Sequence, residues 1–146
     1  MYEIYMLGHS VILTNDILEE WNKHHSKYSR SWYVKMLRRG KIIHYRHDTD
    51  DGDLRIKVLN AIEENAHQAV LKDMRLVEAS LLEEADQIVS SMDDKMRNHF
   101  RRACESVEEL QAVIWINPSK ENENCIIWLR EGALAEDHRR LDYIEE

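Results

Sequence analysis

The sequence KDMRLVEASLLEEADQIVSSMDD, residues 72–94, decides the fold that we predict for this chain. Ile88 and Val89 form a short apolar run between polar residues, which indicates a buried strand. Before it, apolar residues follow the three-to-four spacing of a helix with one buried face: Val70, Met74, Val77, Leu81 and Ala85. The stretch therefore predicts a helix, a short loop, a strand and the start of another helix.

Two acidic residues bracket this unit. We expect Asp73 to open the first helix and Asp93 to lie just past the carboxyl end of the strand. Ligands and metals are usually held at that end of the strands in α/β proteins. Helix capping is the alternative for both residues, because an Asp side chain satisfies main-chain N–H groups at a helix N-terminus and favours its positive end.

Short apolar strands and amphipathic helices alternate along the rest of the chain. Further strands are predicted at 10–14, 41–45 and 113–116. Helices are predicted from about residue 17, over 31–39 with Gly40 closing it, from 54 to a break near Lys72 with Asp53 as the cap, over 94–105 and over 125–130. This alternation predicts an α/β fold with a short, mostly parallel β-sheet flanked by helices. We expect a single domain over 1–146 that ends in an acidic tail, 134–146.

Composition fits an ordinary globular protein, with 43% apolar and 33% charged residues among 146. No apolar run is long enough to span a membrane, and Cys104 and Cys125 are too few for a disulfide framework. We therefore expect a cytoplasmic protein with no membrane partner. The net charge of −8 argues against non-specific coating of nucleic acid. Two local basic clusters nevertheless occur, Arg30, Lys35, Arg38, Arg39 and Lys41, and Lys95, Arg97, Arg101 and Arg102.

Other kinds of site are weakly supported. The loop RHDTDDGD, residues 46–53, carries Asp50, Asp51 and Asp53, but it lacks the spacing of an EF-hand calcium loop. The histidine pairs His24–His25 and His44–His47 lack the additional ligands that a zinc site requires. Neither a nucleophile–base motif nor a glycine-rich phosphate loop is present in the sequence.

Three carboxylates stand out by their positions relative to the predicted strands: Glu20, Asp73 and Asp93. Carboxylates gathered at one edge of a sheet repel each other, and a divalent cation offsets that repulsion. Oxygen ligands suit Mg²⁺ or Mn²⁺, which activates water and stabilises charge on a phosphodiester under attack. For Glu20 the alternative is exposed helix surface.

Four segments, in order from Ser10 to Ala133, resemble PIN-domain nucleases: TNDILEEW, KDMRLVEAS, IVSSMDDKMR, and VIWINP followed by IIWLREGA. In KDMRLVEAS the family often has a His two residues after its acid, where this chain has Arg75. The resemblance implies Glu20, Asp73 and Asp93 as catalytic metal ligands, with Asp94 as a fourth metal ligand. It also implies metal-dependent hydrolysis of single-stranded RNA, often as a toxin with an antitoxin partner.

One departure from the family separates two functional hypotheses. PIN domains begin with a central strand that ends in the first catalytic Asp, and the only acid between Met1 and Ser10 is Glu3. The resemblance thus implies an N-terminally truncated PIN-like fold, in which residues 1–9 are the remnant of the first helix region. The first hypothesis is a Mg²⁺- or Mn²⁺-dependent ribonuclease whose basic clusters contact RNA phosphates. The second is a catalytically inactive interaction module that forms a homo-oligomer.

Overall fold

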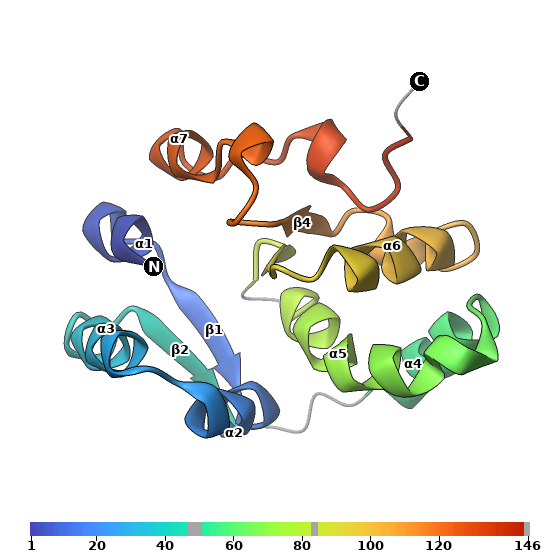
Figure 1. The fold of residues 1–146 in the computed structure, drawn as a ribbon, viewed down its shortest axis with the longest axis horizontal. Helices are drawn as coiled ribbons and strands as arrows, with labels where there is room; N and C mark the ends of the chain where they lie inside the picture. Colours follow the sequence, from blue (N-terminus) through green and yellow to red (C-terminus); the bar gives the residue numbers. More distant parts are fainter. Residues whose placement is uncertain (47–50, 83–84, 145–146) are drawn as a thin grey trace.

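Helices and strands alternate along the chain, as predicted, in a computed structural model that describes residues 1–46, 51–82 and 85–144. In order they are α1 (Tyr2–Leu7), β1 (Val11–Thr14), α2 (Asn15–His24), α3 (Lys27–Arg38), β2 (Ile42–Tyr45), α4 (Gly52–Asn60), α5 (His67–Ser80), β3 (Ile88–Ser90), α6 (Asp94–Ala103), β4 (Ile114–Ile116) and α7 (Cys125–Arg130) (Figure 1). Short 3₁₀ turns lie between several of them. The α/β class is therefore confirmed.

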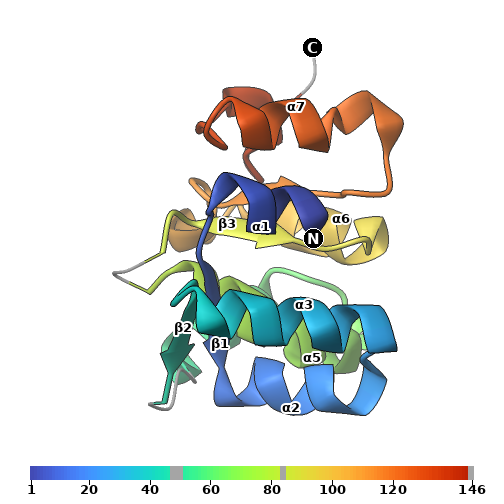
Figure 2. The same ribbon diagram turned by 90° about the vertical axis from the view of Figure 1, so that its left-hand side faces the viewer.

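The strands are parallel, but they form two sheets where the sequence predicted one. β1 pairs with β2, with Val11 opposite Ile42, and β3 pairs with β4, with Ile88 opposite Ile114. In Figure 2, β3 runs across the direction of β1 and β2, and strands that cross in this way cannot share a hydrogen-bond ladder. Within the described residues, β1 and β3 thus each have a strand neighbour on one side only.

The larger core lies between β3, β4 and helices α4, α5 and α6. β4 is buried on both faces, as expected of a strand in a parallel sheet covered by helices. Its Trp115 packs in the core that contains Phe100 and Val89, whereas Ile114 and Ile116 pack on the other side against Trp128 of α7. Helix α5 contacts both β1 and β3 and so connects the two sheets (Figure 1).

Side-chain caps fix the helices of the N-terminal part. The Ile17 N–H donates to the Thr14 hydroxyl at the start of α2, and Ser26 and Ser29 form a reciprocal capping box at the start of α3. This capping box makes α3 begin at Lys27, four residues before the predicted start. Gly40 follows α3 at φ +64°, a left-handed conformation that suits glycine, so its predicted role is confirmed.

The predicted start of α5 is wrong. The helix begins at His67, so Asp73 lies inside it and does not open it. The break between α4 and α5 falls at 61–63, not near Lys72. The apolar spacing stays in phase across these residues and therefore hides the break from pattern analysis.

The cap of α4 is Asp51 rather than the predicted Asp53. The Leu54 N–H donates to a carboxylate oxygen of Asp51 over 3.0 Å, while Asp53 lies in the first helical turn. Its negative charge there still favours the positive end of the helix. His47 and Asp50, which entered the zinc and calcium alternatives, lie outside the described residues.

The segment 134–144, expected as part of an acidic tail, packs against β4. Leu141 is buried in the larger core, and its N–H donates to the Val113 carbonyl over 2.9 Å. The Arg139 guanidinium lies over the Trp128 ring at 5.3 Å. None of the helices in the described residues combines the length and apolar character needed to span a bilayer.

Candidate functional site

Helix α5 presents two carboxylates, one on each side of its buried stripe. Val70, Met74 and Val77 have no exposed surface and define that stripe. At 3.6 residues per turn, Asp73 falls on one side of it and Glu78 on the other. Both acids therefore lie at the edge of the buried face of α5.

Glu78 is neutralised inside the protein. Its side chain is 1% exposed and accepts two hydrogen bonds from the Arg55 guanidinium, at 2.7 and 2.8 Å. The Asp51 N–H donates a third, over 3.1 Å, from the start of α4. Buried ionic groups persist when they are paired and hydrogen-bonded in this way. Glu78 thus has a complete structural explanation, joining α5 to α4.

Asp73 is half-buried and has no such explanation. No side-chain hydrogen bond or ion pair joins it to any of the described residues. Burial raises the pKa of Asp73 above its ordinary value of 3.8, and the negative charge of Asp93 raises it further. The cations Arg75 and Lys72 lower this pKa, and Glu20 raises it, without reversing the upward shift. The three carboxylates proposed from the sequence therefore act on one another electrostatically.

Asp93 lies at the start of α6, three residues after β3 ends. One of its carboxylate oxygens accepts the Met96 N–H over 2.9 Å, so the capping alternative is confirmed for Asp93. For Asp73 that alternative is wrong, because the residue is inside α5. A single capping bond leaves the exposed Asp93 carboxylate with further acceptor capacity toward a cation.

Glu20 on α2 is the third carboxylate near this place, but its oxygens face cations. Arg75 and Lys72 of α5 each approach within 3.7 Å, Lys23 within 3.8 Å and His24 within 3.2 Å. Partial burial raises the pKa of Glu20, yet these four groups lower it more, so the net shift is downward. In this arrangement Glu20 bridges α2 to α5, and Arg75 takes part in that bridge.

Asp94 is held on the other side of the α6 N-terminus. One oxygen accepts from the Asn117 amide at 3.0 Å, and the other meets the Lys120 ammonium at 2.5 Å. The hydrogen bond from Asn117 and that from Lys120 lower the pKa of Asp94. Both oxygens are thus engaged by protein groups, and Asp94 is not among the charges that shift the pKa of Asp73.

Asn117, directly after β4, was not among the site residues predicted from the sequence. It is 2% exposed, its amide also donates to the Met92 carbonyl, and its oxygen accepts from the Ser119 N–H and hydroxyl. Asn117 therefore ties the loop after β4 to the loop that carries Asp93 and Asp94. The sequence signal was its place at the carboxyl end of a buried strand.

The described residues contain no group of three or more Asp, Glu, His or Cys side chains arranged to hold a metal ion. Among the predicted ligands, Asp73 forms no side-chain hydrogen bond or ion pair with the described residues, and Asp93 forms a single capping bond. Mg²⁺ and Mn²⁺ can bind proteins through one or two carboxylates while they keep several waters. Cysteine chemistry is disfavoured, because burial raises the pKa of the Cys104 thiol to about 12 and that of Cys125 above its ordinary value.

We predict that Asp73→Asn stabilises the fold at neutral pH. A raised pKa in the folded state means that ionised Asp73 costs stability, a cost absent below 3.8 and complete above the folded pKa. The variant should gain roughly 1–3 °C in Tm near pH 7, and the gain should shrink toward pH 4. Thermal unfolding followed by circular dichroism at both pH values measures this, and a loss of Tm near pH 7 would assign Asp73 a structural contact.

Comparison with known proteins adds no relative. No protein-family model matches the chain, and neither the curated proteins nor the solved structures contain a match.

Proposed function

We propose that this chain is a PIN-like, Mg²⁺- or Mn²⁺-dependent endoribonuclease, possessing a metal site built on Asp73 and Asp93. The observation that carries the proposal is the ionisable, half-buried Asp73, which repels Asp93 and makes no ion pair in the described part of the chain. Proteins keep such an unfavourable charge where function uses it. The order of the PIN-like segments along the sequence supports the same reading.

The residues around the pair have distinct roles in this proposal. Asp73 and Asp93 would hold the cation, and Asn117 would keep the Asp93 loop in place. A bound divalent ion would supply positive charge for the phosphodiester and lower the pKa of water. Lys72, with 65% of its side chain exposed, and Arg75 lie beside the pair and would orient Glu20 toward it.

The test is cleavage of a single-stranded RNA labelled with a fluorophore and a quencher, in Mn²⁺, in Mg²⁺ and in EDTA. We expect cleavage that needs the divalent ion and that falls at least about a hundredfold in Asp73→Asn and in Asp93→Asn. Both variants should fold, because Asn removes an unfavourable charge at 73 and is itself a good helix cap at 93.

The matched control is Asp53→Asn, which removes one carboxylate from the exposed first turn of α4. It should cleave like the parent chain. Absence of metal-dependent cleavage by the parent, or equal cleavage by parent and both site variants, would contradict the proposal.

A second candidate is an interaction module that associates with its own kind, and the divided sheet favours it. β1 and β3 each lack a strand neighbour on one side within the described residues, and such edges offer free N–H and C=O groups to another chain. Two-stranded sheets are also marginally stable without further partners.

Sedimentation velocity across a wide concentration range tests this second candidate. We expect a dimer that dissociates on dilution, because added strands or helices would cover these edges. A monomer at every concentration, together with metal-dependent RNA cleavage, would remove the interaction module from consideration.

A further inference from the structure

The structure separates the two basic clusters that the sequence offered as contacts for RNA. The cluster on α6 is largely occupied by the protein itself. Arg97 pairs with Glu123 at 2.6 Å, Arg101 donates to the Tyr143 carbonyl, and Arg102 approaches Glu63 at 3.8 Å. Arg97 holds the loop after β4 and Arg101 the C-terminal segment, whereas Arg102 lies near the connection between α4 and α5.

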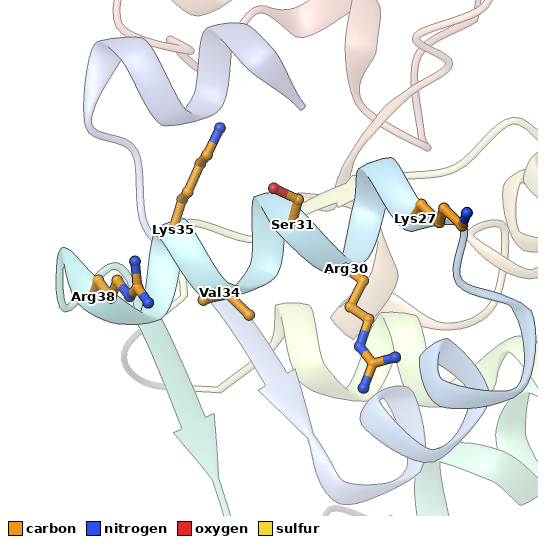
Figure 3. A pocket seen from close by; sticks show the side chains of 6 residues that line it. All are labelled: Lys27, Arg30, Ser31, Val34, Lys35 and Arg38. Atoms are coloured by element: carbon orange, nitrogen blue, oxygen red, sulfur yellow. The ribbon is translucent and has the colours of Figure 1, made fainter.

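Most of the cluster on α3 is available to a partner, although Arg39 lies over the Tyr5 ring at 3.8 Å and donates to the Tyr5 carbonyl. Lys27, Arg30, Lys35 and Arg38 are exposed, and none of them forms an ion pair with another of the described residues. They line a shallow hollow of about 390 Å³ together with Ser31 and Val34, and Figure 3 shows them spread from one end of the helix to the other. The opposite side of α3 is anchored by the buried Trp32 and Met36.

Charge along the sequence is segregated around this helix. No Asp or Glu occurs between Glu20 and Asp48, while that stretch holds eight of the twenty Lys and Arg. In a chain with a net charge of −8, the α3 face is therefore a local positive field on an otherwise negative molecule. Such a field attracts a polyanion, and its strength falls as salt is added.

We propose that the exposed face of α3 binds the phosphate backbone of single-stranded nucleic acid. Cations placed along a helix, with a hydroxyl among them, match a run of phosphates. Tyr28, 58% exposed and next to Lys27, offers a ring on which a base can stack. The inference shares its RNA ligand with the proposed function, but binding to α3 requires no metal and no cleavage.

Other partners fit this face less well. Protein interfaces have an apolar, charge-depleted centre, whereas the one apolar side chain in this hollow is Val34, 39% exposed. A membrane-binding helix inserts a continuous apolar face. In α3, Trp32 and Met36 are buried inside the protein, and the exposed Val34 and Leu37 lie on the same side as the cations. Binding of a nucleic-acid backbone requires neither an apolar interface centre nor an apolar inserting face.

The test is fluorescence anisotropy of a labelled single-stranded RNA, measured in EDTA over a series of salt concentrations. Four phosphate contacts predict a slope of log K against log salt of about −2.8, and Arg30→Ala with Arg38→Ala should reduce it to about −1.4. Affinity at low salt should fall about fivefold or more in that double variant. Tyr28→Ala should weaken binding without changing the slope.

The matched control is Lys95→Ala with Arg102→Ala, which removes two exposed cations from α6 and should leave both affinity and slope unchanged. Equal weakening by the two double variants would overturn the assignment to α3. No RNA binding at low salt, tighter binding to duplex, or equal binding to polyglutamate would overturn the single-stranded ligand. Because chelator is present throughout, failure here is distinguishable from failure of the metal-dependent activity.

Discussion

Helix α5 buries Val70, Met74 and Val77 completely while it lies against both sheets. This burial fixes the rotation of the helix, and the rotation decides where every polar residue on it points. Glu78 is directed to Arg55 and becomes part of the scaffold. Asp73 lies on the other side of the stripe, where burial and the negative charge of Asp93 raise its pKa. The same packing that stabilises the helix thus creates the local repulsion.

The charged side chains of the molecule fall into two groups, those paired within the fold and those that form no ion pair in its described part. Glu78, Glu123 and Asp94 are each matched to a nearby cation and join segments that are distant in sequence. The exposed cations of α3 and the Asp73 carboxylate form no ion pair with the described residues. A charged group without a partner in the fold is a candidate for binding a ligand. A charged group paired within the fold mainly joins segments of the chain.

The sequence predicted the strands well because buried apolar runs such as Ile114–Ile116 have few alternatives. The prediction failed at the break between α4 and α5, because the apolar spacing from Leu54 to Val70 continues in phase across it. The position of Asp73 within α5 was mispredicted for the same reason. The division into two sheets depends on how β1 and β3 cross, which no local pattern encodes.

Position relative to the predicted strands singled out Glu20, Asp73 and Asp93 as candidate ligands. Asp93 lies just past the end of β3 as expected, whereas Asp73 lies inside α5. Sequence position could not find which charges are already neutralised, because pairing depends on tertiary neighbours. Glu20 lies near Lys72 and Arg75 of α5, and Asp94 lies near Lys120 and the buried Asn117. None of these contacts between distant segments has a sequence signature. Glu20 and Asp94 are engaged by neighbouring side chains, so the metal site that we propose is built on Asp73 and Asp93.

The most direct test of the central claim is a titration of the ¹⁵N-labelled chain with substoichiometric Mn²⁺, followed by NMR. Paramagnetic Mn²⁺ broadens the amide signals nearest to it. A metal held by Asp73 and Asp93 should broaden the signals of the α5 centre and the α6 N-terminus first, and Asp73→Asn should abolish that selectivity. Broadening spread over the acidic surface, or unchanged in Asp73→Asn, would contradict the account.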